Sequence, residues 1–281
     1  IDVTGISVSD GMSTNTLGTS NFIAGVNAGN SIASGGIDNT VVGDEAGTAI
    51  TTGRFNTLIG KEAGDALNDA DSNVAIGKGA LSSDTQGSQS TAIGTLALTA
   101  QNFTSATDAY NVAVGAEAGA AVTTGTFNTI IGGLAGDAIT TGIRNTTVGH
   151  QSLSSNTTGG LNTALGRSAL LSNTTASNNT AVGYEALYAN TTGANNVAVG
   201  NYALDANTTG GENTAVGYQS LSSATTVDNN TAFGYTALRD NTSGSSNLAV
   251  GVNTLRLNTT ASNNTGVGAF ALDVNTTGAS N

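Results

Sequence analysis

The order of apolar and polar positions repeats every 17 residues along most of this chain. A phrase of the type Asn-Thr-Ala-Val-Gly opens at Asn39, recurs at Asn56 and, in variant form, reaches Ser90. After four extra residues it resumes at Asn111 and returns every 17 residues up to Asn264. Repeats of this kind indicate stacked units, each too small to bury its own apolar face. We therefore expect a quasi-one-dimensional body in which each unit covers the next.

The spacing of glycines within one repeat predicts the elements. With the opening Asn as position 1, position 5 is Gly from Gly43 to Gly268, and position 15 is usually Gly. The runs between them suit β-structure and lack a 3.6-residue period. The pattern predicts an all-β, parallel β-solenoid or β-roll with short strands near positions 1–4 and 8–12. About 15 coils would span on the order of 70 Å at ~4.8 Å per coil. A disordered linker is the alternative, but disorder needs no strict apolar phase.

Two neighbouring apolar positions suggest that the strand is covered on both sides. Position 4 is a large apolar residue throughout, as at Val42 and Phe233. Adjacent strand residues point to opposite faces. We expect position 4 to point into the roll and position 3 to face another chain, because small side chains permit close approach. The residues expected at this chain–chain surface include Ala75, Ala113, Ala181 and Ala215. A monomeric solenoid with exposed Ala is the alternative to this homo-oligomer.

The second half of each repeat follows a compensation rule. Where position 9 is Gly, as at Gly47, position 12 is apolar, as at Ile50. Where position 9 is Leu, as at Leu187, position 12 is usually polar, as at Asn190. One large apolar group per coil would thus fill a constant volume.

Asparagine recurs at positions 1 and 12, so the same amide returns once per coil. Stacked amides can hydrogen-bond along such an assembly. For position 1 we predict an amide ladder. For the Thr-Thr pair at positions 13 and 14, a ladder and a simple turn preference remain alternatives.

Composition removes several function classes. Charged residues make up 9%, the net charge is −12 and the seven Lys and Arg are scattered. These numbers argue against nucleic-acid binding. The chain has no Cys, which excludes disulfides and thiolate chemistry, and no apolar run long enough to span a membrane. The absence of Pro suits uninterrupted strand ladders. We read the sequence as a segment of a longer fibre.

The repeats resemble those of two groups of fibrous proteins. Units such as Asn73-Val-Ala-Ile-Gly77 resemble the head repeats of YadA-like trimeric autotransporter adhesins. The phrase Asn179-Thr-Ala-Val-Gly-Tyr-Glu-Ala-Leu187 looks still more like repeats in tail-fibre proteins of phages and fibre-like proteins of bacteria. The resemblance covers residues 21–281 and implies a left-handed β-roll, intertwined or side by side in a homotrimer. The coil is longer than in the autotransporters, and the sequence shows no coiled-coil stalk or membrane anchor.

Two departures from the pattern are candidates for contact with a receptor. Residues 1–20 read as an irregular lead-in or divergent first coils, and residues 21–281 as one repeat region. A four-residue insertion lies within residues 95–110, and insertions in solenoids often form loops on a contact face. Aromatic side chains there and near position 6 could stack on sugars or simply pack along the outer wall. They are Phe103, Tyr110, Tyr184, Tyr202, Tyr218 and Tyr235.

Catalysis is not expected, and we assign no catalytic, cofactor-binding or metal-binding residues. The single histidine, His150, occupies the variable position 6 and is expected to face solvent. The calcium-binding nonapeptide of other β-rolls is absent. A depolymerase site between chains is the enzymatic alternative, although no spacing pairs its carboxylates. Those carboxylates would be drawn from Glu45, Asp65, Glu117 and Asp137.

The expected function is therefore structural and adhesive: a shaft or head segment of an extracellular trimeric fibre that attaches to a host cell or surface. A virion tail fibre is the first choice and a bacterial trimeric adhesin the second. An ice-binding solenoid is the third, suggested by the regular Thr-Thr pairs. The expected partners are two further copies of the chain and an unidentified receptor, for which a surface glycan is the candidate.

Overall fold

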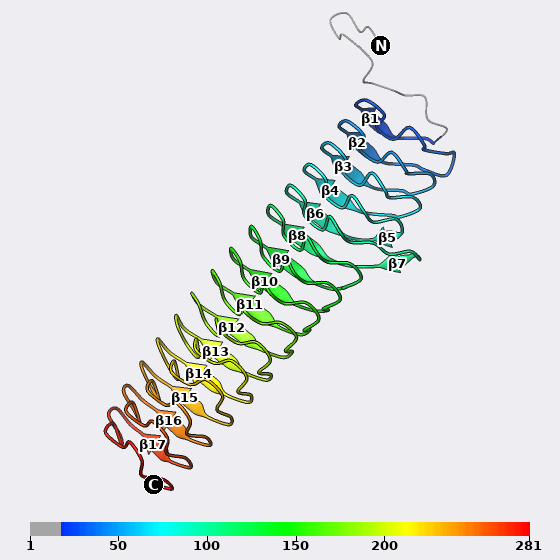
Figure 1. The fold of residues 1–281 in the computed structure, drawn as a ribbon. Helices are drawn as coiled ribbons and strands as arrows, with labels where there is room; N and C mark the ends of the chain where they lie inside the picture. The colour runs from blue at the N-terminus through cyan, green and yellow to red at the C-terminus, as the bar shows by residue number, and fades with distance from the viewer. Residues whose placement is uncertain (1–17) are drawn as a thin grey trace, which may run out of the picture. The chain divides into compact units, whose positions relative to one another are not determined.

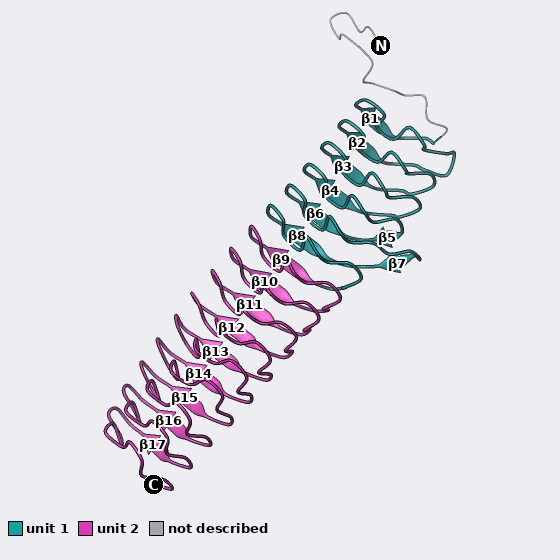
Figure 2. Ribbon diagram, viewed as in Figure 1, with its two compact units in different colours: residues 1–127 teal, residues 128–281 magenta. Residues whose placement is uncertain are grey.

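The structure is a computed structural model that describes residues 18–281 (Figure 1). The expected lead-in therefore lies largely outside the described residues. The chain divides into two compact units, residues 1–127 and 128–281 (Figure 2). We describe each unit by itself.

Unit 1 is a stack of coils, each contributing one three-residue strand. Strands β1, β2, β3, β4, β6 and β8 pair in this order, all parallel. Strands β5 and β7 form a separate two-stranded pair. The bounds are β1 Phe22–Ala24, β2 Thr40–Val42, β3 Thr57–Ile59, β4 Val74–Ile76, β5 Gly87–Ser88, β6 Thr91–Ile93, β7 Thr107–Asp108 and β8 Val112–Val114.

Unit 2 repeats the same arrangement without interruption. Strands β9 to β17 pair in chain order, all parallel and in a constant register such as Ala181 beside Ala198. The bounds are β9 Thr129–Ile131, β10 Thr146–Val148, β11 Thr163–Leu165, β12 Thr180–Val182, β13 Val197–Val199, β14 Thr214–Val216, β15 Thr231–Phe233, β16 Leu248–Val250 and β17 Thr265–Val267. The predicted all-β, parallel solenoid of 17-residue coils is confirmed, and no helix occurs between residues 18 and 281.

The predicted inward and outward positions of the strand are reversed. Position 3 is the buried one: Ala181 and Ala215 have no exposed surface within their own chain. Position 4 points outward, so Leu165 is 45% and Phe233 is 56% exposed. The predictions that position 4 fills the interior and that position 3 faces another chain are therefore wrong. Position 3 is Ala in most coils with a buried Leu at position 9, whereas the buried position 3 residues Leu58 and Ile130 belong to coils with Gly at position 9.

The second predicted strand, at positions 8–12, is also wrong. The described coils turn repeatedly there instead. Positions 7 and 9 adopt left-handed backbone conformations, with φ of 51° at Glu185 and 53° at Leu187. Extended strands require negative φ, so this half of the coil cannot form a strand. The left-handed residue at position 9 lets a Leu side chain be buried in the interior.

The compensation rule has a direct steric explanation. A Cβ added to Gly47 would lie 2.9 Å from Cδ1 of both Ile50 and Leu58. A Cβ added to Gly136 would lie 2.8 Å from Cδ1 of Ile139. Coils with Gly at position 9 thus fill the interior from position 12, whereas coils with Leu at position 9 leave room for an amide there. One large apolar group from the second half of the coil is buried in both types, as Ile50 and Leu187 are.

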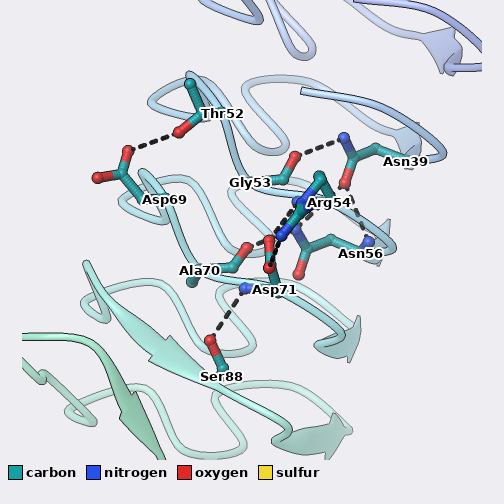
Figure 3. A network of polar contacts seen from close by, with 9 residues as sticks. All are labelled: Asn39, Thr52, Gly53, Arg54, Asn56, Asp69, Ala70, Asp71 and Ser88. Atoms are coloured by element: carbon teal, nitrogen blue, oxygen red, sulfur yellow. Dashed lines mark hydrogen bonds and ion pairs between the residues drawn. The ribbon is translucent and has the colours of Figure 1, made fainter. Parts of the chain in front are cut away.

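Amide ladders run through the interior of each unit. Asn56 donates both its backbone N–H (3.0 Å) and its side-chain Nδ2 (3.1 Å) to Oδ1 of Asn39 (Figure 3). The same Nδ2 donates to the carbonyl oxygen of Ala70 at 2.8 Å, which closes its own coil. In unit 2 the position 12 amides form a second ladder, as from Asn173 to Asn156 at 2.8 Å. The predicted ladder at position 1 is confirmed, and most of these buried amides are satisfied by one another and by backbone carbonyl oxygens.

The glycine at position 5 is required by two constraints at once. Gly166 has φ of 137°, a conformation that L side chains rarely adopt. A Cβ there would lie 2.4 Å from the carbonyl oxygen of Gly183 in the next coil. Successive coils can therefore approach closely only where both carry Gly.

The insertion changes the interior as well as the surface. Strand β6 pairs with β8 through Thr91 and Val112, four residues further apart than in the 17-residue coils. The carboxylate of buried Asp84 accepts hydrogen bonds from Gln101 Nε2 (2.6 Å) and from the backbone N–H of Phe103 (3.0 Å). It also accepts one from the backbone N–H of Gly87 at 3.0 Å. The extra residues thus fold back over the coil and satisfy a buried carboxylate.

Candidate functional site

The outer strand face consists of the side chains at positions 2 and 4 of the strands. In unit 2 position 2 is Thr, Val or Leu, and position 4 is Val, Ile, Leu or Phe in all nine strands. Exposure at position 4 reaches 67% at Val267. Nothing within the single chain requires apolar residues at an exposed position. The outer strand face is therefore a candidate contact surface.

A second feature of unit 2 is the tyrosine column, formed by Tyr184, Tyr202, Tyr218 and Tyr235. Their ring centroids lie 5.3, 6.1 and 5.5 Å apart in that order. The first two contacts are edge-to-face, and the last pair is stacked with an interplanar angle of 13°. Tyr218 and Tyr235 are exposed, and Tyr184 and Tyr202 are half-buried. Four of the six predicted contact residues are thus brought together.

Polar groups border the tyrosine column. Arg167 Nη1 donates to the hydroxyl of Tyr184 at 3.2 Å, and its guanidinium carbon lies 5.5 Å from the centre of that ring. A hydrogen bond to Glu185 is the main reason that the pKa of Tyr184 is raised. Asn201 Oδ1 accepts the backbone N–H of Tyr184 at 3.0 Å. The column therefore combines aromatic rings with fixed donors and acceptors.

The other two predicted contact residues lie in unit 1. Tyr110 is exposed and stacks on Phe127 with a centroid distance of 5.6 Å. Phe103 is only 7% exposed. It packs against the turn at Gly87, where an added Cβ would lie 2.7 Å from its ring. Phe103 is therefore a core residue of the insertion and offers little surface to a receptor. The sequence did not reveal this because an insertion says nothing about which of its side chains turns inward.

The threonine pairs follow the turn next to the Asn ladder. The position 13 hydroxyl donates to the position 13 carbonyl of the next coil, as from Thr174 to Thr191 at 3.1 Å and from Thr191 to Thr208 at 2.9 Å. The position 14 residues, such as Thr192, are exposed. One hydroxyl of each Thr-Thr pair, at position 13, therefore forms a hydrogen bond between successive coils.

Half-buried carboxylates occur at position 10. Burial is the main cause that raises the pKa of Asp65, and the negative charges of Glu62 and Glu45 add to it. Burial likewise raises the pKa of Asp205 to about 6, with a contribution from Glu185. The sequence indicated no spacing that pairs such carboxylates, but stacking brings Glu45 near enough to raise the pKa of Asp65 in the next coil.

Groups of three or more potential metal ligands are not found in the described part of the chain.

Two further features belong to the polar surface. His150 is exposed, as predicted. A shallow depression of about 310 Å³ lies in unit 2, beside Gly211. It is lined by Ala194, Asn195, Thr209, Gly211, Glu212, Asp228 and Asn229. The Asp228 carboxylate is held there by the backbone N–H of Gly211 at 2.7 Å.

Comparison with known proteins found no matching family model, no matching curated protein and no matching solved structure. Over residues 18–281 no helix is long and apolar enough to cross a membrane. The outer strand face and the tyrosine column are therefore the two candidate functional surfaces of the stack.

Proposed function

We propose that this chain is a rigid segment of a homotrimeric surface fibre that mediates attachment to a host cell or surface. The carrying observation is the outer strand face, on which position 4 is apolar in every coil of unit 2 and is half-buried or exposed, never buried. A stack of parallel coils is stiff because each coil is hydrogen-bonded to both neighbours along its length. Such a body suits the display of a surface at a distance from an anchor.

The size of the outer strand face supports association. Nine strands at ~4.8 Å spacing, each three residues long at ~3.3 Å per residue, give a face of roughly 400 Å² in unit 2. Monomeric soluble proteins rarely expose larger contiguous apolar patches. A standard interface buries about 800 Å² per partner, so the outer strand face of unit 2 alone would supply about half of one. A surface with this repeat is best matched by a second copy with the same repeat.

Three chains about an axis parallel to the stacks would keep identical coils at the same level. This arrangement, and a left-handed coil, are what the resemblance to trimeric fibres implies. The proposed interface follows position 4, on the outer strand face, and not position 3, which is buried within each chain.

Among fibres, a virion tail fibre is the first choice because the phrase from Asn179 to Leu187 resembles repeats of such fibres, and a bacterial adhesin is the alternative. Both place the segment outside the cell. An ice-binding role is less well supported, because the position 13 hydroxyls are used as donors within the stack. We also propose that the segment binds its target without catalytic turnover.

Light scattering on the purified chain tests the proposal. We expect a trimer for the wild type and a lower mass for the double variant Leu165→Glu/Phe233→Glu, which places charges on the outer strand face. The matched control Thr158→Glu/Thr192→Glu alters exposed turn residues of the same unit and should remain trimeric. A monomeric wild type would overturn the trimer.

A further inference from the structure

The tyrosine column is an addition to the fold rather than a requirement of it. Position 6 elsewhere holds residues as different as Asp44, Lys61 and His150. Coils with those residues have the same strand and turn pattern as coils with Tyr184, Tyr218 or Tyr235. Tyr202, one residue later in its coil, still joins the column. Because the fold does not require Tyr at these positions, the clustering of four rings over consecutive coils points to an external partner.

We propose that the tyrosine column binds a linear glycan whose chain runs parallel to the stack. This inference rests on the proposed attachment role and names the chemistry of its target. The column is one ring wide and several coils long, so it suits an extended polymer rather than a globular ligand. The rings recur every 5.3 to 6.1 Å along the stack, so successive sugar units of one extended chain can each meet a ring.

The chemistry of the column favours sugars over other polymers. The negative faces of aromatic rings attract the weakly positive C–H groups on the flat side of a pyranose. Arg167 and Glu185 at one end, and Asn201 beside Tyr184, offer groups that hydroxyls can hydrogen-bond. With a net charge of −12 and one Arg at the column, nucleic acids and polyanionic glycans are disfavoured. Equatorially linked neutral pyranoses present the flat faces that the rings require.

The chain supplies its own reporter for binding. It has no Trp and six Tyr, four of which form the column. Tyrosine fluorescence therefore reports mainly on this site. Titration with cellohexaose and with chitohexaose, two β-1,4-linked hexasaccharides, should give a saturable change with at least one of them. A dissociation constant near 1 mM or below is expected, and glucose or N-acetylglucosamine alone should bind more weakly.

Variants separate the column from other surfaces. Tyr218→Ala/Tyr235→Ala should weaken hexasaccharide binding about tenfold or more in calorimetry, whereas Tyr218→Phe/Tyr235→Phe should retain most of it because the rings remain. Tyr110→Ala removes an exposed, stacked tyrosine outside the column, and Glu212→Gln alters the polar depression. Both should leave binding unchanged. Thermal unfolding of each variant checks that the stack is intact.

Several outcomes would overturn the inference. One is that neither hexasaccharide shows saturable binding. Another is that Tyr218→Ala/Tyr235→Ala binds the hexasaccharide with the same affinity as the wild type. A loss of trimer mass in that variant would instead make the column a chain–chain contact. Light scattering on the same samples separates the two proposals. If the protein is a trimer but binds neither sugar, only the proposed glycan site is wrong. If it is a monomer that binds sugar through the tyrosine column, only the proposed trimer is wrong.

Discussion

The side-chain oxygen Oδ1 of Asn207 has no hydrogen-bond partner within the described structure, because the equivalent residue of the next coil is Ala224. Asn207 itself donates to Oδ1 of Asn190 at 2.9 Å. In the same ladder Asn190 donates in turn to Asn173 at 3.0 Å. One substitution in the repeat therefore leaves a buried acceptor unsatisfied, which costs about 1–3 kcal/mol.

Restoring the ladder at this point should stabilise the protein. Ala224→Asn should be introduced together with Val227→Ala, which reproduces the natural pair Asn173 and Ala176. Compared with Val227→Ala alone, the double variant should gain about 1–3 kcal/mol in free energy of unfolding, because Asn207 recovers a donor. Chemical denaturation measures the difference. An unchanged or lower stability in the Val227→Ala background would contradict this explanation.

The glycine at position 5 should be sensitive to substitution for two separable reasons. Gly166→Ala should cost at least about 3 kcal/mol, combining backbone strain with a collision against Gly183. Gly268 has the same role in its coil and φ of 115°, but an added Cβ would meet no atom within 4 Å. Gly268→Ala should therefore cost only the backbone strain, about 1–3 kcal/mol. Equal losses in thermal unfolding would show that the close approach of coils is unimportant.

The compensation between positions 9 and 12 can be tested by changing one coil type into the other. Leu153→Gly leaves a cavity, and the loss should be about 2–4 kcal/mol after relief of the left-handed backbone. Adding Asn156→Ile should recover about 1–2 kcal/mol, because Ile would fill the space as Ile139 does beside Gly136. Asn156→Ile alone should destabilise through overpacking. If the double variant is less stable than Leu153→Gly, the rule does not reflect shared volume.

Asp205 should make stability depend on pH. The unfolded carboxyl group loses its proton near pH 4, whereas burial keeps the folded group protonated until about pH 6. Between these values the folded state binds more protons, so the free energy of unfolding falls as pH rises. Asp205→Asn should remove this fall. At pH 7 it should stabilise the protein by about 1 kcal/mol, since partial exposure screens the charge.

The measurement is the thermal midpoint from pH 3 to pH 7.5 for the wild type and Asp205→Asn. The two proteins should differ little near pH 3 and diverge above pH 5. Glu212→Gln, which changes an exposed carboxylate in the same unit, should follow the wild type. Parallel pH profiles for the wild type and Asp205→Asn would contradict the raised pKa.

The 17-residue period alone determined the parallel β-solenoid, the amide ladder at position 1 and the exchange between Gly47 with Ile50 and Leu187 with Asn190. Each of these three features follows from the repeat, because residues at the same position of successive coils lie next to one another in the stack. The period could not decide which side of the strand is inside. Positions 3 and 4 are both apolar, and only the tertiary structure shows that the left-handed turn at position 9 places its Leu side chain in the interior with position 3.

The candidate site was partly predictable in the same way. The recurrence of Tyr at and near position 6 identified Tyr184, Tyr202, Tyr218 and Tyr235 as a group, whereas the contacts between successive rings are seen only in the structure. Phe103 belongs to an insertion outside the period, so its burial depended on how the extra residues fold over Asp84. The repeat determines which residues of successive coils stack on one another. The direction of a side chain outside the repeat depends instead on the space that its neighbours leave.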